Sequence, residues 1–291
     1  MSLLGAGEIR SLLEQHGLAA RRSLGQNFVA DPALVERIAA LAEVGPGRPA
    51  LEIGPGLGSL TLALAARGGR VLAVELDDGL AALLPDTLER HLGDDATRVE
   101  VLLGDALRLD WPTVLDERGD AQDVDSWTVV ANLPYNVAVP VIIRLLAGAP
   151  QVGRLVVMVQ HEVADRLAAR PGGRTIGVPS IKVGWYASVR LLTAVPPEVF
   201  VPRPRVQSAV VSIDRRDPPS GSVDPAAVFE LVDRAYSQRR KMLRSTLGAV
   251  VPMPAFEAAG IEPTARPEQL DVTDWARLAE AVALLDTDPA S

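Results

Sequence analysis

The strongest constraint on the fold is an alternation of short apolar runs with longer helical patterns across residues 50–169. Short apolar runs bounded by glycine or polar residues are typical of buried strands. A repeated series of such β-α units predicts a parallel sheet with helices on both faces. The expected strands are 50–53, 71–75, 99–103, 127–131 and 154–159, and the expected helices are 59–67, 79–90, 137–147 and 161–169.

The flanking segments extend this pattern. Asp31 and Pro32 are a favoured N-cap and a favoured first helical residue, so they predict a helix that runs to about Ala42. Two late apolar runs, 190–195 and 206–213, flank a proline-rich loop and are expected to form antiparallel strands at an edge of the sheet. Further helices are expected at 7–16 and 178–187, and a loop at 21–28.

The C-terminal quarter has a different pattern. Pro218–Ser222 (PPSGS) has the composition of a linker, and only helical patterns follow it. We therefore expect an α/β domain over residues 1–216 and a small all-α domain over residues 217–291. The expected helices of the second domain are 224–236, 238–248, 254–259 and 273–285.

Composition excludes several classes of site. The chain has no cysteine, and its three histidines are far apart, so neither disulfides nor a metal site is expected. We expect a cytoplasmic protein, because no apolar run is long enough to span a membrane and the N-terminus lacks a secretory pattern. The net charge of −8 argues against a general nucleic-acid binder. Basic residues nevertheless outnumber acidic residues in the segment 203–244, which could present a basic surface. A monomer is expected, because nothing in the sequence demands an oligomer.

A glycine-rich turn follows the first expected strand. Gly54 and Gly56 lie between that strand and the next helix, where a backbone without side chains can approach a ligand closely. Glu75 ends the next strand, at the position where a carboxylate accepts hydrogen bonds from ribose hydroxyls. Asp105 follows the third strand and could accept from an adenine amine, or it could simply cap a helix. These features predict a cofactor that contains a nucleoside.

The spacing of the glycines favours one cofactor over another. A dinucleotide site typically has G-x-G-x-x-G, whereas this loop has its third glycine one residue early and Ser59 at the expected position. S-adenosylmethionine (SAM) has no pyrophosphate to be held, so the shorter G-x-G-x-G pattern suits it. A NAD-dependent oxidoreductase remains the alternative at this point.

The fourth strand ends in Asn132-Leu133-Pro134-Tyr135. Pro134 ends the ladder and pushes Leu133 toward extended geometry, which places a backbone carbonyl beside the Asn132 side-chain oxygen. Two neighbouring acceptors followed by an aromatic ring suit a flat heterocycle that carries an NH2 group. The alternative is an ordinary strand end with a proline turn.

Taken in order, these motifs resemble the ribosomal RNA adenine N6-dimethyltransferases of the small-subunit type. The resemblance covers nearly the whole chain. It rests on residues 24–28 (LGQNF), 51–58 (LEIGPGLG), 74–77 (VELD), 104–106 (GDA), 132–136 (NLPYN), 195–210 (VPPEVFVPRPRVQSAV) and 239–244 (RRKMLR).

The resemblance implies a Rossmann-like, seven-stranded methyltransferase domain that binds SAM, and a helical C-terminal domain that recognises RNA. It implies dimethylation of adenine N6 in 16S ribosomal RNA, within the small subunit or its precursor. The implied cofactor contacts are Asn27, Val29, Gly54, Glu75, Asp105 and Asn132, joined by Gly56 from the glycine loop. The implied residues of the target-adenine site are Asn132, Leu133, Tyr135 and Phe200.

Aromatic and basic residues complete the expected site. Tyr135 is expected to stack on one face of the adenine, and Phe200, in its proline-rich loop, on the other.

Two alternative functions remain: a 23S rRNA adenine methyltransferase that confers antibiotic resistance, and a ribosome-assembly factor with a vestigial pocket. The candidates for phosphate contacts are Arg203, Arg205, Arg239, Arg240, Lys241 and Arg244.

Overall fold

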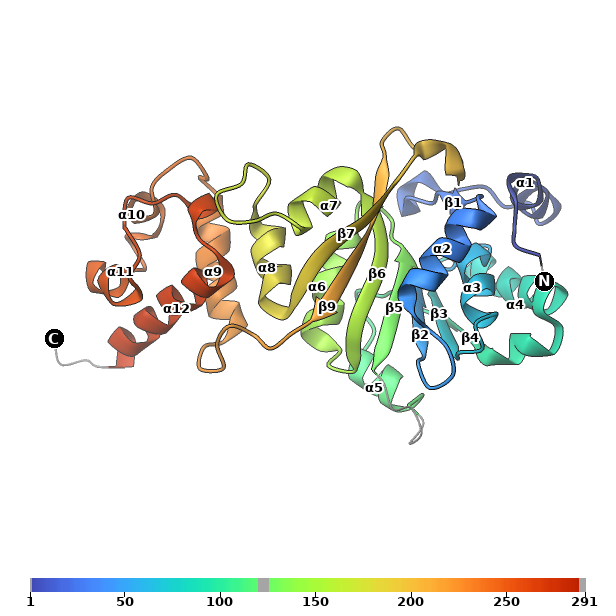
Figure 1. The fold of residues 1–291 in the computed structure, drawn as a ribbon, viewed down its shortest axis with the longest axis horizontal. Coiled ribbons are helices and arrows are strands. Elements are labelled where there is room, and N and C mark those ends of the chain that lie inside the picture. The colour runs from blue at the N-terminus through green and yellow to red at the C-terminus, as the bar shows by residue number, and fades with distance from the viewer. Residues whose placement is uncertain (1, 120–125, 288–291) are drawn as a thin grey trace. The chain divides into compact units, whose positions relative to one another are not determined.

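The computed structural model describes residues 2–119 and 126–287 (Figure 1). The described chain divides into two compact units. Unit 1 contains the residues up to Ala164 together with Arg190–Arg215, and unit 2 contains Asp165–Val189 together with the residues from Arg216 onward. Each unit is built around a core of its own.

Unit 1 is organised around a seven-stranded sheet. The strands nearest its centre pair in parallel, and the ninth strand pairs antiparallel with the sixth. The expected Rossmann-like α/β fold is confirmed, including the late antiparallel strand. The strand order is β4 (Val99–Leu103), β3 (Val71–Glu75), β2 (Ala50–Ile53), β5 (Trp127–Asn132), β6 (Val152–Gln160), β9 (Ser208–Arg215) and β7 (Ala187–Val195).

Helices cover this sheet because its central strands are apolar on both faces. On one face, Val35 and Ile38 of the second helix and Leu60 of the third pack with Val130 and Val156 of the sheet. The second helix begins where expected, since the Asp31 carboxylate accepts from the amides of the first turn. The helices of this part are α1 (Ala6–Gln15), α2 (Pro32–Ala42), α3 (Ser59–Ala65), α4 (Asp78–Leu92), α5 (Trp111–Asp116), α6 (Ala138–Gly148) and α7 (His161–Leu167), with 3-10 turns η1 (Arg22–Leu24), η2 (Gly93–Arg98) and η3 (Pro197–Val199).

A second, two-stranded sheet was not expected from the sequence. It pairs β1 (Phe28–Val29) antiparallel with β8 (Phe200–Val201), with Val29 opposite Phe200. The sequence predicts a loop at 21–28 and a proline-rich loop around Phe200, because two-residue strands leave no periodic pattern. This pairing joins the N-terminal segment to the loop between β7 and β9.

Unit 2 is helical. Its core includes Trp185, Phe256 and Trp275, all nearly inaccessible to solvent. Its elements are α8 (Val178–Tyr186), α9 (Pro225–Tyr236), α10 (Leu243–Leu247), α11 (Met253–Ala259), η4 (Pro267–Gln269) and α12 (Val272–Thr287).

The grouping of residues differs in one respect from the expected division at residue 216. Residues 165–189 belong with the C-terminal helices, because Ile176, Ile181 and Trp185 pack into the core of unit 2. Pro171, Gly172 and Gly173 mark a break inside this segment, but no pattern there shows which core the flanking helices join.

One helix is much shorter than expected. The sequence predicts a helix at 238–248, whereas α10 covers only Leu243–Leu247. The amides of Leu243 and Arg244 donate instead to the carbonyls of Ala265 and Pro263, at 2.8 and 2.9 Å. Tertiary hydrogen bonds therefore override the helical propensity of the residues before Leu243.

Candidate active site

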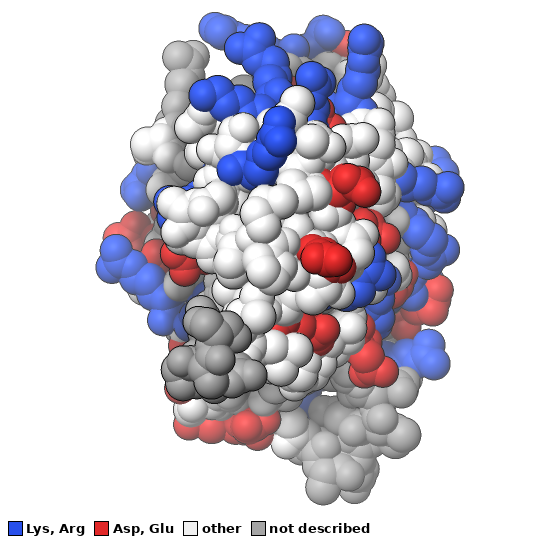
Figure 2. Space-filling model, turned by 90° about the vertical axis from the view of Figure 1, so that its left-hand side faces the viewer, with Lys and Arg blue, Asp and Glu red and all other residues white. Residues whose placement is uncertain are grey.

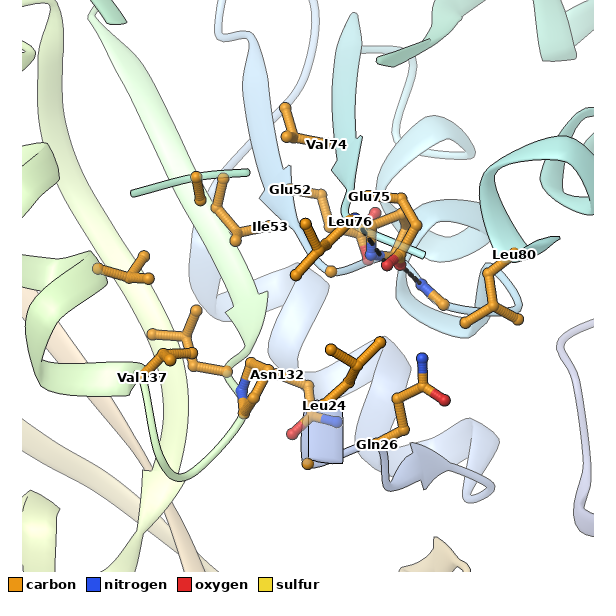
Figure 3. Close-up of a pocket in the computed structure, with 18 of the residues that line it drawn as sticks. Leu24, Gln26, Glu52, Ile53, Val74, Glu75, Leu76, Leu80, Asn132 and Val137 are labelled. Atoms are coloured by element: carbon orange, nitrogen blue, oxygen red, sulfur yellow. Dashed lines mark hydrogen bonds between the residues drawn. The ribbon is translucent and has the colours of Figure 1, made fainter. Parts of the chain in front are cut away.

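A cavity of about 210 Å³ lies where β2, β3, β4 and β5 end. Figure 3 shows side chains from these strand ends and from the N-terminal segment converging on it. Its wall contains every cofactor residue expected from the sequence and most of the expected adenine site: Asn27, Val29, Gly54, Gly56, Glu75, Asp105, Asn132, Leu133 and Tyr135.

Glu75 fixes the glycine loop on one side of this cavity. Its Oε2 accepts from the Gly56 amide at 3.0 Å, and its Oε1 accepts from the amides of Leu76 and Asp77 at 2.8 and 2.9 Å. Burial raises the pKa of this carboxyl, and the three amides offset part of that effect. A carboxylate has about four acceptor positions, so one remains for a ligand hydroxyl.

The positions of Gly54, Gly56 and Gly58 require glycine for conformational reasons, and Gly56 also for a steric one. Gly54, Gly56 and Gly58 have φ values of 71°, 59° and 95°, which L side chains rarely adopt. A Cβ on Gly56 would also lie 3.0 Å from the Phe28 ring. The loop thus packs closely under the N-terminal segment while its backbone faces the cavity.

Asp105 stabilises a turn rather than capping a helix, and it also lines the cavity. Its Oδ1 accepts from the Leu107 amide at 2.9 Å, which stabilises the turn after β4. Its Oδ2 lies 3.4 Å from the exposed guanidinium of Arg108. The residue also lines the cavity, so the local turn holds a carboxylate at the ligand site.

Asn132 is oriented by the N-terminal segment. Its Nδ2 donates to the Asn27 carbonyl at 2.8 Å, while the Asn27 side chain donates to the Gly25 carbonyl at 3.1 Å. This contact assigns the two ends of the amide and leaves Oδ1 as an acceptor. The Leu133 amide donates to Met158, and within residues 2–119 and 126–287 its carbonyl accepts no hydrogen bond. Asn132 and Leu133 both line the cavity, and the paired use of Oδ1 and this carbonyl as acceptors for one amine stays a prediction.

Tyr135 is held by a residue that sequence reasoning missed. Its hydroxyl forms a 2.7 Å hydrogen bond with Oγ of Ser208, the fully buried first residue of β9. Burial raises the pKa of Tyr135, and the Ser208 contact lowers it in part. Ser208 belongs to the Ser-Ala-Val run at the end of the motif at 195–210. No local pattern in the sequence indicates that it contacts Tyr135.

We expect the Tyr135–Ser208 hydrogen bond to position the ring. Ser208→Ala leaves the tyrosine hydroxyl unpaired and should lower kcat/KM for methyl transfer by about tenfold, since one such bond contributes about 0.5–1.5 kcal/mol. Tyr135→Ala should have a larger effect because it removes the ring itself. Equilibrium binding of the cofactor is the control, and an unchanged kcat/KM in Ser208→Ala would contradict the positioning role.

Phe200 is the one predicted adenine-site residue that does not line the cavity. It is 3% exposed and packs in a core with Val29, Val195 and Val210. Its pairing with Val29 places it directly behind a cavity-lining strand. Stacking of Phe200 on a base therefore stays a prediction, and it requires the loop after β7 to move.

The predicted phosphate-binding residues fall in both units. In unit 1, Arg203 is exposed and paired with Glu198, and Arg205 is exposed. In unit 2, Arg239 donates to the Arg174 carbonyl at 2.8 Å. Figure 2 shows basic side chains gathered along the upper edge of one face of the molecule. The remaining predicted residues of unit 2, Arg240, Lys241 and Arg244, are exposed.

Two further findings concern the described residues, 2–119 and 126–287. No group of three or more histidine, aspartate or glutamate side chains there is arranged to hold a metal ion. No helix in those residues has the length and apolar character needed to cross a bilayer.

Comparison with known proteins identifies the family. The chain matches the family described as "Ribosomal RNA adenine dimethylase" over residues 17–284. The "Ribosomal RNA small subunit methyltransferase A" of Acidothermus cellulolyticus is 48% identical over 283 residues, which cover 96% of this chain and 94% of that protein. The protein of the same name from Kineococcus radiotolerans is 47% identical, with 96% and 91% covered.

Solved structures of more distant proteins share the fold. A dimethyladenosine transferase from Plasmodium falciparum has a TM-score of 0.72 and 23% identity, with 86% of this chain and 95% of that chain covered. The 23S rRNA methyltransferase ErmE has a TM-score of 0.64 and 24% identity, with 88% and 100% covered. With residues 17–284 matched and the expected cofactor residues gathered around one cavity, the chain belongs to the ribosomal RNA adenine dimethylase family.

Proposed function

We propose that this protein transfers two methyl groups from SAM to the N6 amine of adenines in the 16S RNA of the small ribosomal subunit. The observation that supports the proposal is the hydrogen bond from Asn132 Nδ2 to the Asn27 carbonyl, which leaves Oδ1 of this cavity-lining residue as an acceptor next to Leu133 in the chain. A primary amine on a flat base supplies the two N–H donors that this pair requires.

The residues around the cavity fit SAM. Glu75 retains one acceptor position for a ribose hydroxyl, and Asp105 is placed to accept from the adenine amine of the cofactor. Gly56 lets the loop pack against Phe28, because a side chain there would collide with that ring. When bound, SAM supplies an electrophilic methyl group on sulfonium sulfur, so the protein need not generate the reactive group itself.

The chain's own part in the reaction is alignment of the amine. The N6 lone pair of adenine is delocalised into the ring, which makes the amine a poor nucleophile. Hydrogen bonds from its two N–H groups to Asn132 Oδ1 and the Leu133 carbonyl favour a pyramidal nitrogen and localise that lone pair. Tyr135, anchored by Ser208, holds the ring plane. Alignment of this kind contributes up to ~7–11 kcal/mol in good cases.

The site does not need a residue that removes the proton from the methylated N6 nitrogen. The methylated nitrogen carries a positive charge and loses its proton readily to water, so no dedicated base is needed. After the first transfer the amine has one N–H left, and only one of the two acceptors is used in the second round. The site must then accept a bulkier amine at the same position.

The substrate assignment rests on the relatives. Proteins that are 43–48% identical over almost the whole chain carry the name small-subunit methyltransferase, which favours 16S RNA over the 23S alternative. The likeness to ErmE supports the fold alone. Family membership removes the nicotinamide alternative, and the oriented Asn132 argues against a vestigial pocket. We also propose that the protein acts in the cytoplasm as a monomer.

Transfer of labelled methyl groups tests this assignment. The intact protein would be incubated with labelled SAM and with undermethylated small or large ribosomal subunits, and the RNA digested to nucleosides. We expect label in N6,N6-dimethyladenosine from small subunits only. Label from large subunits would favour the 23S alternative, and no label from either would favour an assembly factor.

The basic residues of unit 2 provide a second prediction. Replacing Arg240, Lys241 and Arg244 with serine should weaken binding to small-subunit RNA and make the affinity less dependent on salt. Each lost phosphate contact reduces the slope of log K against log salt by about 0.7–0.9. The affinity for SAM should stay unchanged. An unaltered salt slope would remove these residues from the RNA interface.

Point substitutions are preferable to truncation for this purpose. Removal of residues 217–291 would uncover Trp185 and Ile181, whose core partners lie in α9 and α12. Loss of RNA binding in a truncated chain would therefore report partial unfolding as readily as a lost contact.

A further inference from the structure

Unit 2 contains a cavity of its own, which the proposed mechanism does not use. Its volume is about 430 Å³, within the range of about 300–1,000 Å³ that is typical of sites for small organic groups. Every described residue of its wall belongs to unit 2, and none of them lines the cofactor cavity. The wall is formed by residues 167–171, by α8 and the residues after it, by Arg216 and by the start of α12.

The floor of this unit 2 cavity, formed by its most buried residues, is apolar. Leu167, Ile176 and Ile181 line it and are at most 3% exposed. The Ser180 hydroxyl, also in the wall, is already used within the protein. It accepts from the Gly177 amide at 3.0 Å and donates to a backbone carbonyl of α7. The floor therefore suits a flat organic ring that needs no polar partner on its faces.

Two arginines give the wall a positive charge. Arg216 is fixed in place, because its amide donates to the Tyr186 carbonyl at 2.9 Å and its Nη2 to the Gly184 carbonyl at 2.5 Å. Arg170 is exposed at the end of the segment that follows α7. Among the described residues of the wall the one acid is Asp271, whose Oδ1 accepts from an amide in the first turn of α12 at 2.8 Å. An anionic group is therefore favoured beside the apolar floor.

The loop that begins at Arg170 is joined to the basic segment of unit 2. The Gly172 amide donates to a carbonyl of η4 at 2.8 Å, which fixes the loop. Arg239 donates through Nη2 to the Arg174 carbonyl at 2.8 Å. Arg239 begins the basic run 239–241, which the sequence predicts to contact phosphate. An RNA chain bound along that run therefore meets the loop that forms one side of the unit 2 cavity.

We propose that the unit 2 cavity receives one unpaired nucleotide of the substrate RNA, with its base on the apolar floor and its phosphate at the arginines. The inference rests on the proposed function, because it takes ribosomal RNA as the partner. Unpaired bases are the part of an RNA that can leave the strand and enter a pocket. Arginine binds phosphate through two parallel hydrogen bonds and also stacks on base planes, so Arg170 and Arg216 suit both halves of a nucleotide.

Filling the unit 2 cavity tests the proposal. Gly184 lies in α8 and lines the cavity, and a Cβ placed there meets nothing within 4 Å. Gly184→Leu should extend a side chain into the cavity without a clash and lower the affinity for undermethylated small subunits about tenfold, the scale of one lost base contact. Gly184→Ala is the matched control, since one methyl group leaves most of the volume free. Its affinity should stay within about twofold of wild type.

Folding is checked in the same two variants. Both replace a glycine inside a helix, so their melting temperatures should be no lower than that of wild type. Their affinity for SAM should also be unchanged. Wild-type affinity for small subunits in Gly184→Leu would overturn the proposal.

The double variant R170S/R216S tests the charged side of the cavity independently. It should weaken subunit binding and reduce the slope of log K against log salt by about 0.7–0.9, the value of one phosphate contact. R37S/R67S removes two exposed arginines of unit 1, has the same net charge and should keep the wild-type slope. Equal slopes in the two double variants would overturn the proposal. So would a loss of affinity in R170S/R216S with none in Gly184→Leu, because it would leave a phosphate contact without a bound base.

A photocrosslinker in the wall identifies the occupant. The chain has no cysteine, so Thr273→Cys provides a single thiol, at an exposed position of the wall, that can carry a photoactivated group. With small subunits present, we expect a crosslink to 16S RNA at an unpaired nucleotide, mapped by reverse transcription. A crosslink to a ribosomal protein or to paired RNA alone would overturn the proposal.

These outcomes separate the inference from the proposed function. If wild type transfers no methyl label to small subunits, the proposed function fails. If wild type transfers label and Gly184→Leu matches its subunit affinity, the function stands and the role of the unit 2 cavity is wrong.

Discussion

Asn132→Ala should abolish most methyl transfer while leaving the cofactor bound. The substitution removes Oδ1, one of the two acceptors for the adenine amine, and the bond that ties this segment to the Asn27 carbonyl. Loss of a single preorganised hydrogen-bonding group typically costs about 10²–10³-fold in rate. We expect a fall of this size in single-turnover transfer to small subunits, with SAM affinity within about tenfold of wild type.

Asn132→Asp is the matched control for this result. Aspartate keeps an acceptor of the same size but replaces the donor to Asn27 with an oxygen that repels the carbonyl. Transfer should be intermediate between wild type and Asn132→Ala. Turnover like that of wild type in the alanine variant would sink the assignment of Asn132 as the amine acceptor.

Glu75→Ala should have the largest effect on the cofactor. It leaves the amides of Gly56, Leu76 and Asp77 without their shared acceptor, inside a buried loop. Each unpaired buried group costs about 1–3 kcal/mol, so the loop loses its ligand-binding shape as well as the ribose contact. Cofactor affinity should fall at least a hundredfold, measured by equilibrium dialysis, and the melting temperature should fall as well.

Glu75→Gln separates the shape of this residue from its charge. The glutamine oxygen can still accept from Leu76 and Asp77, but its NH2 group opposes the Gly56 amide. We expect a loss near tenfold in affinity, well short of that in Glu75→Ala. Equal affinities in wild type and Glu75→Ala would show that the carboxylate is not part of the cofactor site.

The sheet and most of the site could be predicted because their signals are local. Each central strand is a short apolar run that ends at a chemically distinctive residue, such as Glu75, Asp105 or Asn132. Carboxyl ends of parallel strands meet at one edge, so residues distant in sequence could be placed around one cavity before any coordinates were known.

The remaining features depend on contacts that no local pattern encodes. Ser208 bonds Tyr135 across 73 positions of sequence. The two-residue strands at Phe28 and Phe200 exist only because they pair with each other. Glu52 belongs to a motif noted for its glycines, and its nearly complete burial is a property of the packed structure.

The division of unit 2 into two pieces of chain has a consequence for synthesis. The segment containing Trp185 is made long before Trp275, with which it shares a core. At translation rates of about 5–20 residues per second, roughly 5–20 s separate the two tryptophans. During that interval the apolar side chains of Asp165–Val189 have left or are leaving the ribosome without their permanent cover. This segment thus stays accessible to a chaperone until the C-terminal helices of unit 2 have been made.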